Sequence, residues 1–431
     1  DVRVALAGLI SGQGNADAVA EPRQAAAASP QAFYVSGETG DDSGAGTKTD
    51  PWKTLAHARD TVRACRGRGP GSCPRPVSAS AAVMVYILAA TYRLTQPLEF
   101  TAADSGTPQA PVTWRSLATP QTASCVRITG AVNVPLSDFK AASNERLPNP
   151  SHVVQTDLKV HGLHPRPATR CSRTDYGTYG NMMTSGGNVL QLTHGEELLQ
   201  LARWPNLGTP PSSTKSGFAD YVTHAGVADT SDKNAVIYAG AEGAAGVGDR
   251  PKRWLHADQL ALHGYYKWQW VDQYMAVQQI HVANSTIELA CSGAGCGHYW
   301  PAAPGLPFYA VDLIEELDSE GEWWLNRTSG QLFVWMPAAS QTADGIELSV
   351  CCQQQARLHR GDCNWFGGNL VSLTNVSHFT LADIRVDHVR GTGVSCDNCT
   401  NVTLSGLTVK WTTKTGIAVS AGKGVTVSRC N

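Results

Sequence analysis

The C-terminal part of the chain repeats with a period of 23 residues from Asn375 onward. Leu381 is followed at this spacing by Leu404 and then by Val427. The same spacing joins further positions, all apolar or glycine: Ile384 with Leu407, Val386 with Val409, Gly393 with Gly416, Val394 with Ile417, and Val402 with Val425. A unit this short cannot enclose a core of its own, so neighbouring units must stack.

Apolar residues alternate with Thr, Ser or Asp inside each unit, as in Val402-Thr403-Leu404. This is the pattern of a strand with one buried face. If each strand pairs in parallel with the same strand of the next unit, the apolar positions form one continuous column. A leucine-rich repeat needs a Leu-x-x-Leu-x-Leu framework, which these units lack. The sequence therefore predicts an all-β fold, a right-handed parallel β-helix with about 23 residues per coil.

The N-terminal part is less regular but carries three recognisable segments. Phe33 to Ser36 and Val83 to Leu88 are expected to be strands, and the spacing of apolar residues predicts a helix over Trp52 to Ala64. We expect this helix to cap the end of the solenoid, where the apolar cross-section would otherwise face water. The insert from Arg66 to Ser80 is rich in Gly, Pro and Arg and is predicted to be a surface loop.

Four segments follow from these patterns. Residues 1–30 are expected to be disordered or a signal-peptide remnant, because a short apolar run is followed by Ala-rich sequence. Residues 31–148 are the cap and the first coils, 149–345 an aromatic-rich β insertion or subdomain, and 346–431 the regular coils. We expect the solenoid to continue beyond Asn431.

Composition and charge narrow the class of partner. Charged residues make up only 16% of the chain, and 34 basic residues stand against 36 acidic ones. No basic stripe indicates a nucleic acid, and no apolar stretch is long enough to span a membrane. An uncharged partner such as a polysaccharide or oligosaccharide fits, and we expect a monomer.

Cysteines and glycosylation sequons indicate the secretory pathway, and hence a secreted protein. Several of the 12 cysteines are closely spaced, and disulfides are favoured over a zinc site because the single Cys-x-x-Cys has no second half at ligand spacing. The disulfide candidates are Cys65 with Cys73, Cys291 with Cys296, and Cys396 with Cys399. Five Asn-x-Ser/Thr sequons point the same way: Asn284, Asn326, Asn375, Asn398 and Asn401.

The middle segment offers candidates for substrate contact. Its aromatic run is interpreted mainly as core, with sugar stacking as the alternative: Tyr265, Tyr266, Trp268, Trp270 and Tyr274. Arg203, beside Trp204, and Asp272 are better candidates for a structured polar contact, because apolar neighbours would partly desolvate them. The acidic run from Glu315 to Glu322 is expected to be a solvated loop.

Two stretches resemble a known superfamily. FYVSGETGDDSGAGTKTDPWKTL and VYILAATYRLTQPLEFTAADSGTPQAPVTWRS are similar to the N-terminal segment of pectate-lyase-like β-helix proteins. LLQLARWPN, LHGYYKWQWVDQY and LIEELDSEGEWWLNRTSGQLFVWMP are similar to the β-helix glycoside hydrolases of family 141. The resemblance implies a carbohydrate-active enzyme, similar to a group associated with xylan- and fucose-containing glycans. The carboxylates thought to be catalytic in that family lie on later coils, beyond Asn431, so none is carried over.

Glycoside hydrolysis needs two carboxyl groups, one protonated and one ionised. The regular coils offer Asp383 and Asp387, with His388 beside the latter, as catalytic candidates, although the repeat places no second acid beneath either. These acids are interpreted mainly as solvated. The alternative is an exposed patch in which Lys410 and Trp411 join Asp387 and His388 to bind a sugar.

Two other functions stay open. A polysaccharide lyase or uronate epimerase would need a basic residue and a means of neutralising the uronate, often calcium. A glycan-binding solenoid without chemistry would need only aromatic and polar side chains. The hydrolase leads because no acidic cluster suited to calcium is visible, and no metal or cofactor is expected.

Overall fold

The computed structural model describes residues 29–117, 125–164, 190–208, 220–229, 232–238, 250–254, 259–289, 303–338, 343–350 and 368–431. Strands dominate these residues, and α1 (Leu55–Cys65) is the one α-helix among them. The prediction that most of the secondary structure is β-strand is therefore confirmed. The expectation for the N-terminal thirty residues falls almost wholly outside the described part of the chain.

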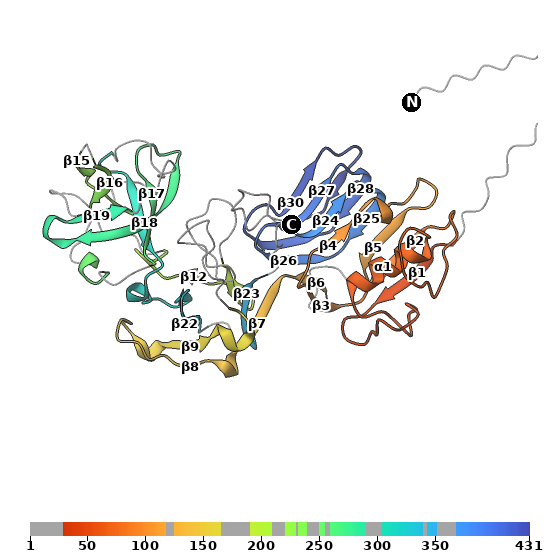
Figure 1. Cartoon of the computed structure of the whole chain (residues 1–431), viewed down its shortest axis with the longest axis horizontal. Helices are drawn as coiled ribbons and strands as arrows, with labels where there is room; N and C mark the ends of the chain where they lie inside the picture. The colour runs from red at the N-terminus through yellow and green to blue at the C-terminus, as the bar shows by residue number, and fades with distance from the viewer. Residues whose placement is uncertain are drawn as a thin grey trace, which may run out of the picture.

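Three parallel sheets form one part of the molecule, at the right of Figure 1. The first has the order β1 (Gln31–Val35), β2 (Val83–Ile87), β5 (Val112–Ser116), β25 (Ser377–Ala382), β28 (Thr400–Ser405), β31 (Thr426–Ser428). The second has the order β30 (Ile417–Ser420), β27 (Thr392–Asp397), β24 (Asn369–Thr374), β4 (Leu98–Phe100). The third has the order β29 (Thr408–Thr412), β26 (Arg385–Val389), β6 (Val126–Thr129), β3 (Ala90–Arg93). From β2 onward, apart from the inserted strands between β6 and β24, the chain visits the three sheets in turn, so each full circuit adds one strand to each.

The pairing register confirms the 23-residue repeat. Leu381 lies opposite Leu404, and Leu404 lies opposite Val427, each pair in adjacent parallel strands. Val386 pairs with Val409 in the third sheet, again one repeat away. One repeat is therefore one circuit through the three sheets, and the alternating apolar residues point into a shared core.

The corners between strands hold residues in the left-handed backbone region at matching positions of successive circuits. One such set is Asn375, Asn398 and Ala421, and another is His378, Asn401 and Gly424. Asn and Gly occupy this region at little cost, which explains their recurrence at these corners. The Asn398 side chain also donates to Asn375 Oδ1 at 2.6 Å, so the corners bond to one another along the stack.

Aromatic side chains fill the interior at the N-terminal end of the parallel sheets. The rings of Phe33 and Trp52 stack with centroids 5.1 Å apart, and Phe100 contacts Phe379 at 4.9 Å. Helix α1 lies beside β1, begins after its N-cap Thr54 and buries one face against this core. The expected helix is confirmed, although it begins three residues later than predicted.

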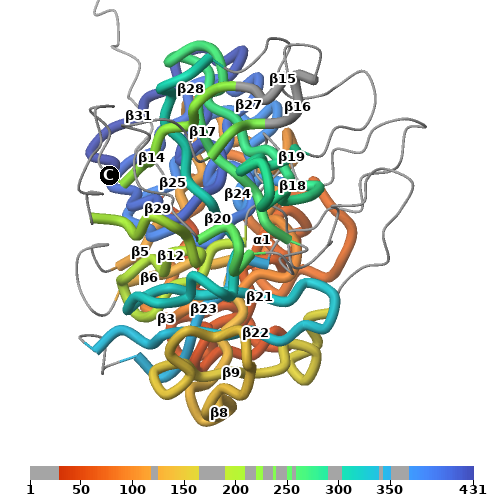
Figure 2. Tube along the Cα trace, turned by 90° about the vertical axis from the view of Figure 1, so that its left-hand side faces the viewer, coloured from red at the N-terminus to blue at the C-terminus, as the bar shows by residue number. Residues whose placement is uncertain are grey.

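The chain leaves the parallel sheets after β6 and returns to them at β24, and the strands between pair almost entirely antiparallel. The main pairs are β7 (Ala131–Pro135) with β23 (Gly345–Ser349), β10 (Leu192–His194) with β23 and β11 (Glu197–Leu198), β9 (Val153–Asp157) with β22 (Gln331–Trp335), and β17 (Ala261–Tyr265) with β18 (Asp272–His281) and β20 (Pro307–Val311). Figure 1 shows these strands to the left of the parallel sheets and below them. Figure 2 is viewed from that side, so the antiparallel strands lie in front of the parallel sheets. The four proposed segments remain a prediction, but the change of pairing lies between β6 and β7.

Two sequence interpretations of the middle segment were wrong. The acidic run is not a solvated loop, since Glu315, Glu316 and Glu322 are buried. Glu316 accepts from Trp254 Nε1 at 2.6 Å and pairs with Arg250, so burial is compensated by partners. The aromatic run is not uniformly core, as described below.

Candidate functional site

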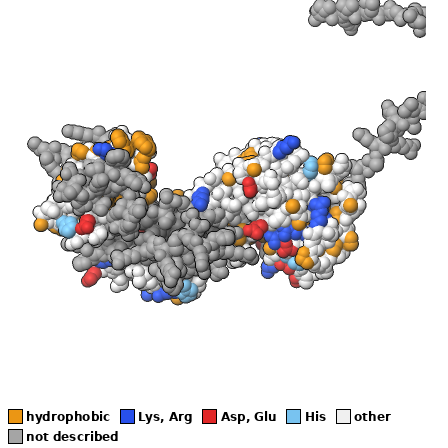
Figure 3. All heavy atoms as spheres, turned by 45° about the horizontal axis from the view of Figure 1, so that its top comes forward, with side chains coloured by type: hydrophobic (Ala, Val, Ile, Leu, Met, Phe, Trp, Pro, Cys, Tyr) orange, Lys and Arg blue, Asp and Glu red, His pale blue; other side chains and the backbone are white. Residues whose placement is uncertain are grey.

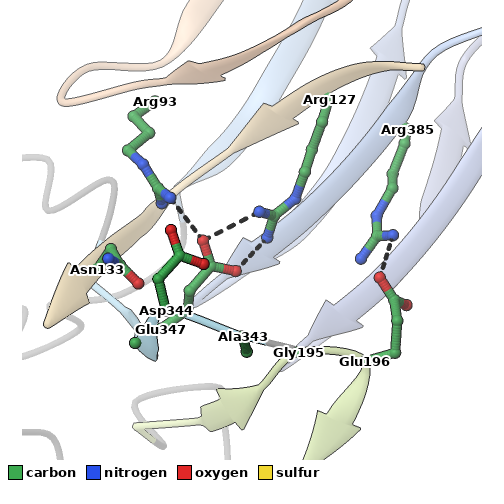
Figure 4. A pocket seen from close by; sticks show the side chains of 10 residues that line it. Arg93, Arg127, Asn133, Gly195, Glu196, Ala343, Asp344, Glu347 and Arg385 are labelled. Atoms are coloured by element: carbon green, nitrogen blue, oxygen red, sulfur yellow. Dashed lines mark hydrogen bonds and ion pairs between the residues drawn. The ribbon is translucent and has the colours of Figure 1, made fainter. Parts of the chain in front are cut away.

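The described residues form a cleft of about 350 Å³ where the third parallel sheet meets the antiparallel strands β7 and β23. Charged side chains dominate its wall (Figure 4). The lining residues are Arg93, Arg127, Asn133, Gly195, Glu196, Ala343, Asp344, Gly345, Glu347 and Arg385.

Two of the arginines come from neighbouring strands of the parallel sheet. Arg127 on β6 lies in register with Arg385 on β26. The residues that follow them, Ile128 and Val386, are fully buried, so strand alternation turns both guanidinium groups away from the interior. The parallel pairing thus places two cations side by side on the wall of the cleft, from segments 258 positions apart in sequence.

Glu347 on β23 reaches across the cleft to two arginines. Its Oε1 accepts from Arg127 Nη1 at 3.0 Å and lies 2.8 Å from Arg93 Nη2, and Oε2 accepts from Arg127 Nη2 at 2.5 Å. Burial alone would raise the pKa of Glu347, but the hydrogen bonds and charge of Arg127 lower it below its ordinary value. Glu347 is therefore an ionised, firmly oriented carboxylate.

Asp344, three residues before Glu347, is the second carboxylate of this segment. Its side chain is exposed, and within the described residues it has no ion pair or hydrogen bond. Its backbone is held in place, because its carbonyl oxygen accepts from Leu136 N at 2.9 Å. Figure 4 shows its carboxylate facing the same space as Glu347. Among the described residues, the cleft therefore contains one carboxylate fixed by arginines and one, that of Asp344, for which no partner is seen.

Asp387 and His388 are not exposed candidates, contrary to both sequence interpretations. Each is completely buried. Asp387 points away from the parallel core, but the antiparallel sheet covers it. Its Oδ2 lies 2.7 Å from both Arg127 Nε and Arg385 Nε. Although burial raises the pKa of a carboxyl, hydrogen bonds from His388 and Arg127 lower that of Asp387 well below its ordinary value.

His388 links Asp387 to Thr193 of β10. Its Nδ1 is 2.9 Å from Asp387 Oδ1, and its Nε2 is 2.8 Å from Thr193 Oγ1. The order hydroxyl, imidazole, carboxylate matches that of a nucleophilic triad. Thr193 and His388 are both completely buried, however, so a substrate cannot reach the hydroxyl. The chain of hydrogen bonds fastens the antiparallel sheet to the parallel one.

The other candidates of the regular coils lie in two different parts of the structure. Lys410 Nζ contacts Glu196 at 3.1 Å, and the Trp411 ring packs 4.6 Å from that of His388, so both lie beside the cleft. Asp383 is elsewhere and pairs with Arg115 at 2.7 Å. The lysine and the tryptophan of the predicted patch therefore border the charged cleft, while its acid and its histidine lie beneath it.

The candidates of the middle segment also differ in how far they are buried. Arg203 is buried as expected, donating to Pro205 O at 2.8 Å and lying 3.6 Å from the Tyr309 ring centre. Trp204 packs against Trp254. Asp272 is not desolvated, because its side chain is 57% exposed while it contacts His263. Trp268 and Trp270 are exposed rather than core.

The cysteine predictions have mixed outcomes. Cys65 and Cys73 form a disulfide with a Cα–Cα distance of 4.8 Å. Cys396 and Cys399 do not; both are buried thiols, and Cys399 Sγ contacts Leu373 O instead. A buried free cysteine packs as a small apolar side chain, so these two thiols fit in the core without a disulfide. Cys291 and Cys296 lie outside the described residues.

Most sequon asparagines lie on the surface. The exposed ones are Asn284, Asn375, Asn398 and Asn401. Asn326 is half-buried, and its Oδ1 accepts from Thr328 N at 3.0 Å and from Ser329 N at 2.9 Å.

Sequence reasoning missed the acids and arginines of the cleft. Arg127 and Glu347 each interrupt a short apolar strand, in VRIT and GIELS, and such an interruption was the available signal. The signal could not show that the two strands meet.

The charged junction predicts a loss of stability in acid. Asp387 and Glu347 have lowered pKa values, so their contribution is complete above the ordinary carboxyl pKa of about 4 and is lost as the pH falls toward the folded values. We expect the urea midpoint of unfolding to fall between about pH 4 and pH 2. The Asp387→Asn variant should show a flatter pH dependence, and a curve parallel to that of the wild type would contradict this assignment.

Comparison with known proteins gives a fold likeness. No family model and no curated protein matches the sequence. A solved structure described as a glycoside hydrolase superposes with a TM-score of 0.57 at 14% identity, covering 88% of this chain and 66% of that one. A second, described as the complex structure of XylC with xylose, has a TM-score of 0.24 at 10% identity, covering 91% of this chain and 64% of that one, and this score is too low to indicate a shared fold. The chain thus shares the fold of a glycoside hydrolase and spans less than two thirds of its length.

Two further features concern metal ligands and membrane-spanning helices in the described part of the chain. No group of three or more His, Cys, Asp or Glu side chains there is arranged to hold a metal ion. Its helices include none of the length and apolar character needed to cross a membrane. On the face in Figure 3, acidic and basic side chains lie next to one another over the parallel sheets.

Proposed function

We propose that the chain is a right-handed parallel β-helix of the pectate-lyase-like type, related to the glycoside hydrolases of family 141. We further propose that it hydrolyses a polysaccharide in the cleft between β6, β26 and β23, which is a different place from the later coils that the resemblance implies for that family's catalytic carboxylates. The parallel sheets that stack at 23-residue spacing and the fold likeness to a glycoside hydrolase support the β-helix. Secretion, N-glycosylation and a monomeric state belong to the same proposal, supported by the Cys65–Cys73 disulfide and the exposed sequons.

The observation that carries the enzymatic proposal is the pair of unlike carboxylates on one short segment. Glu347 is held ionised by Arg127 and Arg93, whereas Asp344 is free of arginine contacts in the described structure. Hydrolysis needs one carboxyl that acts as the acid and one ionised carboxylate that acts as nucleophile or base. The arginines suit Glu347 to the second role, which leaves Asp344, on the same segment, for the first.

The roles follow from these environments. Asp344 gives its proton to the leaving glycosidic oxygen as the bond from that oxygen to the anomeric carbon breaks. Glu347 stabilises the positive charge that develops on the sugar, as nucleophile or as the base that takes a proton from water. The arginines keep Glu347 ionised and oriented, and they remain paired throughout. Water supplies the group that replaces the leaving sugar.

A polysaccharide lyase is the second candidate, favoured by one observation. The Arg93 side chain is 41% exposed at the cleft, where it can face the carboxylate of a uronate. The lyase would remove the C5 proton and leave a double bond in the product, without adding water. A non-catalytic glycan-binding cleft is the remaining alternative.

Product analysis distinguishes these activities. The purified protein is incubated with xylan, a fucosylated polysaccharide and polygalacturonate, and new reducing ends are measured together with ultraviolet absorbance. We expect reducing ends without the absorbance of an unsaturated uronate. Reducing ends with that absorbance would establish the lyase, and polysaccharide binding without new ends would establish a binding protein. Either result would reject the hydrolase.

A further inference from the structure

The connection between β17 and β18 presents two tryptophans to solvent, away from the residues that line the cleft. The Trp270 side chain is 78% exposed and that of Trp268 is 46% exposed. A soluble protein usually covers at least part of an indole of this size, and exposed tryptophans are enriched where another molecule binds.

The connection is anchored at its base and closed by a turn. Tyr266 is buried, its hydroxyl donates to Leu262 O at 3.0 Å, and its carbonyl oxygen accepts from Ala303 N at 2.7 Å. Val271 N donates to Trp268 O at 3.2 Å, which closes a turn around the two intervening residues. A platform fixed in this way loses little conformational entropy when a ligand binds.

Polar residues flank the two tryptophans in the sequence, Lys267 before them and Asp272 after them. Lys267 Nζ lies 5.7 Å from the centre of the Trp268 ring. Asp272 is 57% exposed, and its Oδ2 is held 2.9 Å from His263 Nε2. His263 is buried, which lowers its pKa despite the neighbouring aspartate. The carboxylate of Asp272 is therefore oriented by a hydrogen bond while it remains accessible to a ligand.

We infer that this platform, formed by Lys267, Trp268, Trp270 and Asp272, binds a polysaccharide chain. The C–H face of a pyranose ring covers an indole, and its hydroxyls bond to the carboxylate and the ammonium group. Size favours a sugar over a protein. An aromatic side chain buries about 150–250 Å², whereas a stable protein interface buries at least about 1,200 Å². The platform would retain polysaccharide near the protein, and the inference stands whether or not the cleft is catalytic.

The test compares binding to insoluble xylan and to cellulose by the full chain and its variants. Trp268→Ala with Trp270→Ala is expected to weaken binding to at least one of these polymers about tenfold, because both aromatic contacts with the sugar rings are lost. The matched control is Leu207→Ala, because Leu207 is 63% exposed and lies outside the platform and the cleft lining. Replacing both tryptophans with tyrosine should preserve most of the binding.

The outcomes are separable from those for the cleft. Unchanged binding by the folded double alanine variant would overturn the inference, as would light scattering showing that the tryptophans instead hold two copies of the chain together. Thermal unfolding establishes that each variant is folded. Cleavage of a short soluble oligosaccharide reports on the cleft alone and should be the same for the wild type and the double variant.

Discussion

Replacing Asp387 with alanine is expected to lower the free energy of unfolding by about 3–5 kcal/mol. Asp387 is completely buried and bonds to Arg127, Arg385 and His388. Removing the carboxylate leaves two guanidinium groups close together at a covered interface with less negative charge to balance them. Urea unfolding at pH 7 measures the effect.

Asp383→Asn provides the matched control. Asp383 pairs with Arg115, whose side chain is 46% exposed, so solvent screens the pair and its loss should cost less than about 1 kcal/mol. If the two variants lost similar stability, Asp387 would not be the fastening point between the sheets. A loss of less than about 1 kcal/mol in Asp387→Ala would lead to the same conclusion.

Replacing Asp344 with asparagine is expected to lower kcat by about 10²–10⁴-fold, because an amide cannot donate the proton that the leaving oxygen requires. Asp344 is exposed and makes no ion pair among the described residues, so the melting temperature should stay unchanged. The measurement is steady-state hydrolysis of the polysaccharide on which the wild type is active.

The control for this variant is Glu145→Gln, an exposed acid outside the cleft lining, which should leave kcat unchanged. Substrates with a better leaving group need less proton donation, so Asp344→Asn should lose less activity on an activated aryl glycoside. An equal loss on both substrates, or no loss on either, would remove Asp344 from the role of general acid. Glu347→Gln is less informative, because it also leaves Arg127 and Arg93 without a partner.

The stability of the junction and the proposed chemistry depend on the same side chains. Arg127 bonds to Asp387 beneath the cleft and to Glu347 within it. A change in how the two sheets dock would therefore move the carboxylate that the proposed reaction uses. The proposed site combines a repetitive scaffold with an inserted segment, and neither part contains it alone.

The sequence by itself determined the parallel stacking and its register. The alternation of apolar and polar residues along a strand is a local property of the sequence. Apolar residues recur every 23 positions, and stacking the repeats in register, with Leu381 over Leu404, is the arrangement that buries all of them. The helix near the N-terminus was predictable for the same reason, because the spacing of its apolar residues is a local signal. The Cys65–Cys73 disulfide followed from the short separation of the two residues.

Only the tertiary structure decided which outward-facing side chains are covered. Asp387 and Asp383 both lie outside the apolar column of the repeat, yet one is sealed beneath the antiparallel sheet and the other pairs near the surface. The cleft depends on contacts such as that of Arg127 with Asp387, which are 260 residues apart. Periodicity describes how a segment packs on its own neighbours. It carries no information about which distant segment covers the outer face, because that choice depends on the complementary shape and charge of the folded surfaces.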